Sequence, residues 1–509
     1  MNRKTLISVV LFLFIILFFS LTYFRWLVYQ GPCGVHDWAQ ADRLSLAISF
    51  YDRGMNFFLP ATQNLHATDG IVGVEFPLQS YLAAVLGNIF GRSQISILFR
   101  LLNTVISCVG LSFLFAACFR ATKDFVVSLV PPIFIFCSPV FIYYTCNYLP
   151  DTASASVVFV GFYFILKYQY NARVKDMLAA MAVLTLASLI KTSAAIYLLS
   201  FMMYVAVQKI FRPSLGRKHN AAFVFSVILS IAVLAGYYQY NQYLNARYEG
   251  VLFLAKARPF SGLDEAMAFI NGPLKNNLFN EYLTEVQYLV WMAIVAAAVP
   301  ILVRTMEGKK QLFYLFISAV GALAVAWLMG KQLEAHDYYI IVILLPVIVY
   351  SIVISVIAIR SVLVSGDNSF PLKIGTVALL IIMFFFADFR LHQRLKPGYK
   401  NGYTGEMPWA IGGDKLLDQL GIPKSEHILV LNELPPNLAL VYFDRRGYHL
   451  DPGNWSNMGQ VAAHMDGFKV DVGVCSEELG RSFLTDTLFK NNFTMLAIED
   501  GKVVFRAKK

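Results

Sequence analysis

The sequence predicts a polytopic α-helical membrane protein with about eleven transmembrane helices, followed by a small soluble α/β domain. Three observations lead to this fold class. Apolar residues occupy 57% of the 509 positions and charged residues only 15%, and the mean hydropathy is +0.58. These values exceed those typical of soluble chains. Long apolar runs recur along residues 1–389, whereas residues 390–509 contain no run long enough to span a bilayer.

The first apolar run is LISVVLFLFIILFFSLTYF, which follows the basic sequence MNRK. It is long enough to cross a hydrocarbon core of roughly 30 Å. It lacks the small-residue cleavage site of a signal peptide, so we expect a retained membrane anchor. Further apolar runs, separated by polar breaks, predict the other spans. The expected spans are residues 5–28, 96–118, 125–143, 152–168, 177–190, 193–210, 221–239, 286–303, 311–329, 338–359 and 373–389.

The basic residues favour one orientation, because short loops rich in Lys and Arg are retained on the cytoplasmic side. The loops that fall on the same side as MNRK are FRATKD, KYQYNARVKD, KIFRPSLGRKHN, RTMEGKK and IRSVLVSGDNSFPLK. We therefore expect a cytoplasmic amino terminus, with residues 29–95 and 390–509 on the outer side. The net charge of +10 then indicates topology and not nucleic acid binding.

The tail, residues 390–509, is expected to form an extracytoplasmic α/β domain. HILVLNE predicts a buried strand, and NLALVYFDRRG predicts a helix closed by Gly447. SEELGRSFLTDTLFK predicts another helix. TMLAIEDGKVVFRA predicts a hairpin that turns at Asp500 and Gly501. None of these segments carries a catalytic motif.

Polar and ionisable side chains gather at the outer ends of the expected spans. Such groups are costly at membrane depth unless they serve a polar site, so their common side predicts a site there. The segment GVHDWAQADRLSLA, which follows the first span, holds several of them. The full set is His36, Asp37, Gln40, Asp42, Glu75, Arg100, Asn147, Asp151, Lys191, Glu334, His336, Asp337 and Tyr338.

Most of these residues also have a structural alternative. Asp37 or Asp42 could cap the helix expected over RLSLAISFYDRG, and Asp151 could cap the fourth span, because Asp is a favoured N-cap residue. Glu75 could be a solvated loop carboxylate. A location at the membrane–water interface, without a role in a site, is the alternative for Arg100, Lys191, His336, Asp337 and Tyr338. These alternatives do not explain why all the residues share one side.

The order of the motifs suggests a family. HDWAQADRLSLAISFYDRGMNFFLP, GVEFPLQSYLAAVLGNIFG, RLLN, NYLPDTAS, LIKTS and HDYYIIVILLP follow one another at the expected span ends. This series, over residues 1 to about 390, resembles the bacterial polyprenyl-phosphate-dependent branch of the glycosyltransferase C superfamily. That branch includes relatives of protein O-mannosyltransferases and aminoarabinose transferases. The first outer loop departs from the family pattern, because WAQA separates Asp37 from Asp42 where adjacent Asp-Glu is common, and Ala39 stands where close relatives often have Arg.

The resemblance implies a glycosyltransferase of the bacterial inner membrane. It would move a sugar from a polyprenyl-phosphate donor to a glycan, lipid or protein acceptor on the outer face. Asp37 and Asp42 would be the catalytic carboxylates, one of which takes the proton of the acceptor hydroxyl. Arg100, Lys191 and His336 would bind the donor and stabilise the departing phosphate. The other residues expected to bind substrate are His36, Gln40, Glu75, Asn147, Asp151, Asp337 and Tyr338.

Metal use and two other functions stay open. The superfamily divides between metal-dependent and metal-independent members, and the chain has no ligand set with the fixed spacing of a metal site. A ligase or polymerase that moves whole glycans from a lipid diphosphate would share the outer-face site. A secondary transporter usually has repeated halves with charges at the midplane, which this sequence lacks. The residues that could supply ligands to a divalent ion are His36, Asp37, Asp42, Glu75, His336 and Asp337.

Overall fold

The computed structural model describes residues 3–211, 216–253, 257–363, 369–396, 399 and 407–508. The chain divides into two compact units, and each is described by itself. Unit 1 consists of Met1–Val28, Arg100–Gln239 and Ala255–Arg394. Unit 2 consists of Tyr29–Phe99, Tyr240–Leu254 and Leu395–Lys509. The contacts thus group the first outer loop with the C-terminal residues.

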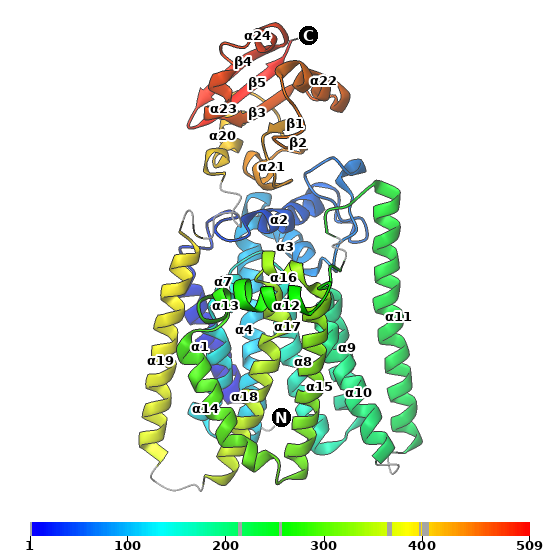
Figure 1. Ribbon diagram of the computed structural model, residues 1–509, viewed down its shortest axis with the longest axis vertical. Helices are drawn as coiled ribbons and strands as arrows, with labels where there is room; N and C mark the ends of the chain where they lie inside the picture. Colours follow the sequence, from blue (N-terminus) through cyan, green and yellow to red (C-terminus); the bar gives the residue numbers. More distant parts are fainter. Residues whose placement is uncertain are drawn as a thin grey trace. The chain divides into compact units, whose positions relative to one another are not determined.

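Unit 1 is a bundle of long apolar helices (Figure 1), and every expected span is helical in it. In a bilayer, a helix satisfies all of its own backbone hydrogen bonds, which is why apolar runs of this length fold this way. The elements that lie wholly or mostly in unit 1 are α1 (Arg3–Tyr23), α4 (Ile95–Thr122), α5 (Phe125–Ser128), α6 (Val130–Phe136), α7 (Pro139–Thr145), α8 (Asp151–Asn171), α9 (Val174–Ile190), η3 (Thr192–Ala194), α10 (Ala195–Phe211), α11 (Arg217–Tyr248), α12 (Leu263–Phe269), η4 (Ile270–Leu274), α13 (Lys275–Asn277), η5 (Leu278–Tyr282), α14 (Glu285–Leu302), α15 (Met306–Met329), α16 (Lys331–Ala335), α17 (Tyr339–Ile343), α18 (Leu345–Val362) and α19 (Ser369–Arg394).

Among the described residues, seven helices are long and apolar enough to cross a membrane, or eight if one bent pair counts as a span. The bent pair is Phe125–Phe136 with Pro139–Thr145, whose axes differ by 81°. The expected span 125–143 is therefore not straight, because the Ser138 side chain caps a new helix that begins at Pro139. The expected spans in α8, α9 and α10 fall outside this group, those in α9 and α10 because each helix has 17 residues.

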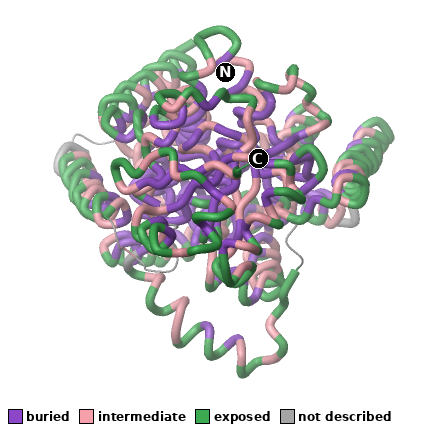
Figure 2. Tube along the Cα trace, turned by 90° about the horizontal axis from the view of Figure 1, so that it is seen from above, coloured by how far each residue is buried: buried purple, intermediate pink, exposed green. Residues whose placement is uncertain are grey.

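Burial separates the central helices of unit 1 from the peripheral ones (Figure 2). The apolar stretch of α17 and α18 is 94% buried, whereas that of α11 is 17% buried. Large exposed apolar faces are unfavourable in water but match the hydrocarbon of a bilayer. The unit is therefore that of a membrane protein, and the predicted fold class is confirmed.

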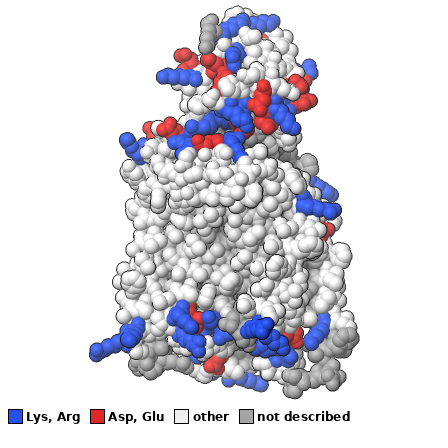
Figure 3. Space-filling model, turned by 180° about the vertical axis from the view of Figure 1, so that it is seen from behind, with Lys and Arg blue, Asp and Glu red and all other residues white. Residues whose placement is uncertain are grey.

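Charged side chains avoid the middle of unit 1. Figure 3 shows Lys and Arg gathered at one end of the bundle, next to a broad band almost without charge. This distribution is the one expected when a hydrocarbon layer surrounds the band. Which side of the membrane the basic end faces stays a prediction.

Unit 2 combines the first outer loop with a five-stranded sheet of order β2-β1-β3-β5-β4. β1 pairs in parallel with β2 and β3, and β5 pairs antiparallel with β3 and β4. The elements of unit 2 are α2 (Asp37–Asp52), η1 (Thr68–Gly70), α3 (Leu78–Phe90), η2 (Arg92–Gln94), η6 (Pro408–Ala410), α20 (Gly413–Gln419), β1 (Ile428–Leu431), α21 (Leu438–Phe443), β2 (Gly447–Leu450), α22 (Met458–Phe468), β3 (Val472–Ser476), α23 (Glu477–Ser482), α24 (Thr487–Asn492), β4 (Phe493–Glu499) and β5 (Lys502–Ala507).

Strand β1 is buried on both faces of the sheet. Ile428 and Val430 pack in one apolar core with α20 and α21, while Leu429 and Leu431 pack in a second core with α22, α23 and α24. Successive residues of a strand point to opposite faces, so a strand covered on both sides is apolar at every position. The buried strand predicted from HILVLNE is confirmed.

Gly447 does not close the helix before it, contrary to the prediction. α21 ends at Phe443, and Asp444 follows it in the left-handed region with φ 49°. Gly447 instead begins β2, where a Cβ atom would lie 1.9 Å from the Ile428 carbonyl oxygen. The glycine is required because two backbone segments meet there without room for a side chain.

The last part of the chain follows the prediction in one element and departs from it in another. The helix predicted over SEELGRSFLTDTLFK is two short helices, α23 and α24, because the Asp486 side chain caps the second one anew. The predicted hairpin is confirmed as β4 and β5. Its turn residues Asp500 and Gly501 have φ of 48° and 77°, as a two-residue hairpin turn requires.

The first outer loop is tied to the sheet within unit 2. The Gly447 N–H donates to the Gln63 carbonyl at 3.0 Å, and the Gly447 carbonyl accepts from the Leu65 N–H at 2.8 Å. Ala41 of α2 packs in the apolar core formed by α20 and α21. The loop and the sheet are therefore parts of one folded body.

This shared body makes a topological prediction. Residues 29–99 and 395–509 must lie on the same side of the membrane, and the basic loops predict the outer side. We expect reporter fusions at Asn88 and Gly412 both to give an outer-side signal. A cytoplasmic signal at both positions would contradict the orientation, and opposite signals would contradict the shared unit.

Candidate functional site

The residues predicted to form the site fall into two sets, one in each unit, and each set is described within its own unit. The set in unit 2 is His36, Asp37, Gln40, Asp42 and Glu75. The set in unit 1 is Arg100, Asn147, Asp151, Lys191, His336, Asp337 and Tyr338.

Asp37 is a buried carboxylate at the very start of α2, 5% exposed. His36 precedes it as the N-cap residue, with φ 59° and no side-chain capping bond. The Asp37 Oδ1 accepts a hydrogen bond from the Trp38 N–H at 2.7 Å. Asp37 is thus the first helical residue, and the capping alternative for it is wrong. The partial positive charge of the helix start favours a carboxylate there.

Gln40 holds the turn that leads into α2. Its fully buried side chain donates through Nε2 to the carbonyl oxygens of Cys33, at 2.8 Å, and Val35, at 3.2 Å. Gly34 allows the turn, because its φ of 70° lies in the left-handed region. These bonds fold residues 33–35 against the first turn of the helix and so fix the backbone around Asp37.

Asp42 lies in the second turn of α2, so the capping alternative for it is also wrong. Its Oδ1 accepts a hydrogen bond from the Asn437 Nδ2 at 2.8 Å. Asn437 is fully buried, and its own Oδ1 accepts from the Ser45 hydroxyl at 3.1 Å and the Asn64 N–H at 3.0 Å. One amide therefore joins α2, the outer loop and the segment before α21.

Asp42 and Glu433 are two carboxyl groups of unit 2 whose charges affect each other. Burial raises the pKa of Asp42 to about 6, although the hydrogen bond from Asn437 and the charge of Arg43 act in the opposite direction. Glu433 is fully buried and accepts from the Ala439 N–H at 2.7 Å. Burial, with the charge of Asp42 added, raises the pKa of Glu433 well above its ordinary value. A charge on either group at neutral pH therefore opposes folding.

The raised pKa of Asp42 predicts a pH dependence of stability that Asp42→Asn removes. The native state holds this proton up to pH about 6 and the unfolded state only up to about 3.8, so stability falls as pH rises between these values. We expect the thermal midpoint of the wild type to fall relative to that of Asp42→Asn between pH 4.5 and pH 7. Parallel pH profiles for the two purified proteins would contradict this assignment.

Glu75 forms a half-buried ion pair in unit 2. Its Oε2 lies 2.6 Å from the Arg43 Nη2, and the two side chains are 16% and 12% exposed. The Arg43 guanidinium also lies over the Phe253 ring, 4.8 Å from its centroid. The alternative of a solvated loop carboxylate is therefore wrong for Glu75.

In unit 1, Lys191 and Asp151 form a buried ion pair between two helix ends. Lys191 is the C-cap of α9, Asp151 is the first residue of α8, and the Nζ–Oδ1 distance is 3.5 Å. The Tyr339 and Tyr338 ring centroids lie 4.7 and 5.5 Å from the ammonium. Pro150 is the N-cap of α8, so the capping alternative for Asp151 is wrong. Burial likewise contradicts the interface alternative for Lys191.

Asp337 belongs to a buried ionic cluster that the sequence did not reveal. Its Oδ2 lies 2.6 Å from the Arg394 Nη2, and its Oδ1 accepts from the Tyr144 hydroxyl at 2.9 Å. Arg394 also pairs through Nη1 with Glu281. All four side chains are buried, so the guanidinium compensates two carboxylates inside unit 1.

A signal for Arg394 was present in the sequence. It closes α19 in FRLHQRLKPG, on the side expected to be outer, where basic residues are disfavoured. A basic residue on the expected outer side therefore indicates a cation that is held by a specific acidic partner. Glu281 has no comparable signal, because it lies among polar residues of an expected loop.

Arg100 and Asn147 organise the turn before α8. The buried Arg100 donates through Nε to the Tyr148 hydroxyl at 3.0 Å and through Nη1 to the Cys146 carbonyl. The Asn147 Oδ1 accepts from the Tyr148 N–H at 2.7 Å, and its carbonyl accepts from the Asn103 Nδ2 at 2.6 Å. The interface alternative for Arg100 is therefore wrong.

His336 and Tyr338 lie just before α17. The His336 Nδ1 lies 3.1 Å from the Gln332 carbonyl oxygen, so this nitrogen donates a hydrogen bond to that carbonyl. The Tyr338 ring stands edge-on to the His336 ring, with centroids 5.4 Å apart, and is 6.0 Å from the Tyr144 ring. Tyr338 is buried, which contradicts its place in an aromatic belt at the lipid surface.

Within the described ranges, no three His, Cys, Asp or Glu side chains gather as a metal site. Three of the expected ligands take partners from the protein. These pairs are Asp42 with Asn437, Glu75 with Arg43, and Asp337 with Arg394.

Comparisons with known proteins bear on this architecture. Residues 75–238 match the family described as dolichyl-phosphate-mannose-protein mannosyltransferase. The crystal structure of ArnT from Cupriavidus metallidurans in the apo state matches with a TM-score of 0.60 at 12% identity, over 98% of this chain and 97% of that one. The chain has the glycosyltransferase C fold. The resemblance indicated by the motif series is confirmed.

Other proteins share the glycosyltransferase C fold with this chain. ArnT from Cupriavidus metallidurans bound to undecaprenyl phosphate matches with a TM-score of 0.57 at 11% identity, over 99% of this chain and 98% of that one. Arabinofuranosyltransferase AftD from Mycobacteria matches with a TM-score of 0.54 at 12% identity, over 100% of this chain and 40% of AftD. No curated protein matches the chain. The family model and the similar structures are those of glycosyltransferases.

Proposed function

We propose that this chain is an integral-membrane glycosyltransferase that moves a sugar from a polyprenyl-phosphate donor to an acceptor on the outer face of the bacterial inner membrane. The observation that carries the proposal is the buried Lys191–Asp151 pair beside Tyr339, at the helix ends of an apolar bundle. An intramembrane ionisable group of this kind usually marks a functional site. The likeness to ArnT bound to undecaprenyl phosphate supports the class of donor.

Lys191 is the proposed partner of the donor phosphate. Its distance of 3.5 Å from Asp151 is longer than the 2.6 Å between Arg394 and Asp337. The looser pair exchanges its partner for a phosphate oxygen at a lower cost. Arg100 and His336 are proposed to add positive charge, which stabilises the leaving phosphate more than the bound donor.

Asp37 is the proposed general base. The acceptor oxygen forms a bond to the anomeric carbon as the bond from that carbon to the phosphate oxygen breaks. The bonding electron pair leaves with the polyprenyl phosphate, and the acceptor proton moves to the Asp37 carboxylate. We propose Asp37 over Asp42 because Asp37 lies beside His36 and closer to the first span, as does the first outer-loop acid of the superfamily that the sequence resembles. Asp42 is then a positioning residue or a group that binds the acceptor or a divalent ion.

The test is incubation of the purified full chain with a panel of polyprenyl-phosphate sugars and candidate acceptors, scored by release of polyprenyl phosphate. We expect release with one class of donor and acceptor. Activity with a glycan on a polyprenyl diphosphate, and with no monophosphate donor, would indicate the ligase alternative. Absence of both turnover and polyprenyl-phosphate binding would contradict the proposal.

Lys191→Ala is expected to lower turnover by roughly 10- to 100-fold and to change donor affinity much less, because the charge acts on the developing phosphate. The measurement is kcat beside the Kd for the polyprenyl-phosphate sugar donor. Lys331→Ala is the matched control, since Lys331 is an exposed lysine of unit 1. The double variant Lys191→Ala/Asp151→Asn also removes the buried Asp151 charge. Comparison of its thermal stability with that of Lys191→Ala shows whether the single variant is misfolded. An unchanged turnover in Lys191→Ala would make this lysine structural.

A further inference from the structure

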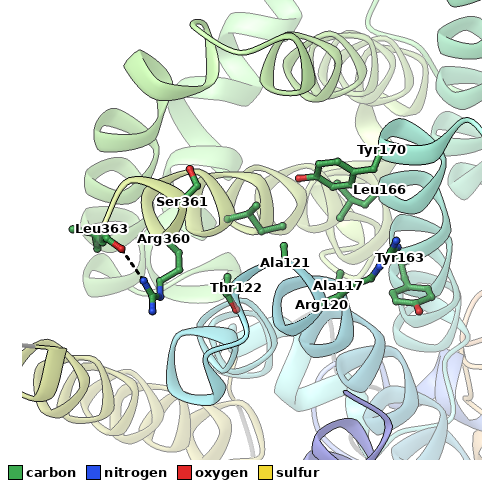
Figure 4. A pocket seen from close by; sticks show the side chains of 11 residues that line it. Ala117, Arg120, Ala121, Thr122, Tyr163, Leu166, Tyr170, Arg360, Ser361 and Leu363 are labelled. Atoms are coloured by element: carbon green, nitrogen blue, oxygen red, sulfur yellow. Dashed lines mark hydrogen bonds between the residues drawn. The ribbon is translucent and has the colours of Figure 1, made fainter. Parts of the chain in front are cut away.

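A second polar site lies at the other end of unit 1 from the Lys191–Asp151 pair. A cavity of about 630 Å³ opens between the last turns of α4, α8 and α18 (Figure 4). Its volume is that of a small-molecule site. Arg100 and Arg120 both lie on α4, so the two regions are separated by roughly 30 Å along this helix. The cavity is therefore distinct from the groups proposed to act in sugar transfer.

The walls of the cavity combine cationic, hydroxyl and apolar groups and contain no acid. The polar lining residues are Arg120, Thr122, Tyr163, Tyr170, Arg360 and Ser361. The apolar lining residues are Ala117, Ala121, Leu166, Ile357 and Leu363. This composition favours an anionic group that is attached to an apolar chain.

Arg120 differs from the other partly buried basic residues at this end. It is half-buried and makes no hydrogen bond or ion pair with a described residue. By contrast, Lys167 lies 2.6 Å from Asp176, Arg360 lies 3.7 Å from Asp124, and Lys310 lies 3.8 Å from Glu307. A half-buried charge without a counter-charge is unfavourable unless an anion binds to it.

Compensation of the helix dipole does not account for Arg120. A basic side chain in a last turn often binds the free carbonyl groups there. Arg360 does so, because its Nη1 donates to the Leu363 carbonyl at 2.8 Å, the bond drawn in Figure 4. Arg120 makes no such bond with a described residue, and it lines the cavity together with Tyr163 and Tyr170.

We propose that this cavity binds the phosphate group of an anionic phospholipid from the adjacent leaflet. Arg120 supplies the charge-assisted donors. Tyr170 supplies a hydroxyl donor, because its oxygen accepts from the Gln311 Nε2 at 3.1 Å and this bond does not use the hydroxyl proton. Leu166 and Ile357 offer an apolar wall for acyl chains. Free phosphate shares the polar chemistry, but it would leave this wall uncovered.

The test measures lipid binding to the purified full chain in detergent by native mass spectrometry. The probes are dioctanoyl phosphatidylglycerol, dioctanoyl phosphatidylcholine and inorganic phosphate. We expect saturable binding of phosphatidylglycerol that weakens about tenfold in Arg120→Gln and about threefold in Tyr170→Phe. Arg173→Gln is the matched control, since Arg173 is exposed near the end of α8 and does not line the cavity.

Each outcome decides the proposal. Selective loss in Arg120→Gln, with the control unchanged, supports it. Equal affinities of the wild type and Arg120→Gln, or equal binding of the two lipids, would overturn it. Binding of inorganic phosphate without binding of phosphatidylglycerol would overturn the lipid source. The readout is binding and not sugar transfer, so this proposal and the proposed function can fail separately.

Discussion

Asp37→Asn is expected to lower sugar transfer by roughly two to four orders of magnitude and to lower thermal stability only slightly, through the lost attraction of the carboxylate to the helix start. Asparagine keeps an oxygen that accepts from the Trp38 N–H, as the Asp37 Oδ1 does at 2.7 Å. The substitution also leaves the Gln40 side chain in place, which donates to the Cys33 and Val35 carbonyl oxygens. The substitution therefore removes the proton acceptor and preserves the shape of the helix start.

Asp42→Asn is the matched control for this prediction, because it is the same isosteric change five residues along α2. Its amide oxygen can still accept from the Asn437 Nδ2, so the hydrogen bond between α2 and Asn437 is kept. We expect it to retain far more transfer than Asp37→Asn with the same donor and acceptor. If only Asp42→Asn lost sugar transfer, Asp42 would be the general base and Asp37 the positioning or binding residue. Transfer near the wild-type rate in both variants would refute a catalytic role for HDWAQAD.

Arg394→Met is expected to reduce the free energy of unfolding by about 3–5 kcal/mol. The guanidinium compensates Asp337 and Glu281, and its removal leaves two carboxylates buried in unit 1 without their cation. Breaking a buried pair from one side costs far more than the pair itself contributes, because the charge left behind is desolvated. The measurement is the thermal midpoint of the purified protein in detergent.

Two variants separate this mechanism from a general loss of an arginine. Arg304→Met changes an exposed arginine of unit 1 and should alter stability by about 0.5 kcal/mol or less. The triple variant Arg394→Met/Asp337→Asn/Glu281→Gln removes the orphaned charges and should recover much of the stability. A midpoint of Arg394→Met equal to that of Arg304→Met would show that solvent reaches the ionic cluster.

The membrane-spanning part of the fold could be predicted from the sequence because its cause is local. A run of about twenty apolar residues must satisfy its backbone within itself in lipid, so each expected span is a helix. The bend at Ser138 was missed because the apolar run continues through it. The hairpin at Asp500 and Gly501 was found because its turn chemistry is also local.

The candidate site could be predicted only in part. Polar residues in an apolar chain drew attention to Asp37, Lys191 and Asp337, because burial of such groups requires a reason. Their partners could not be found in the same way. Arg394 lies 57 residues from Asp337, and Asn437 lies 395 residues from Asp42. No local pattern connects residues at these separations.

The sequence by itself placed the Asp42 carboxylate directly before an expected helix, RLSLAISFYDRG. Only the tertiary structure decided that this carboxylate would meet Asn437, lose water and acquire a raised pKa. The same holds for Gly447, which local turn chemistry assigned to a helix end and strand pairing placed against Ile428. Secondary structure follows from the spacing of apolar residues and the backbone hydrogen bonds within one segment. The protonation state of a side chain and its hydrogen-bond partner depend on burial against distant segments.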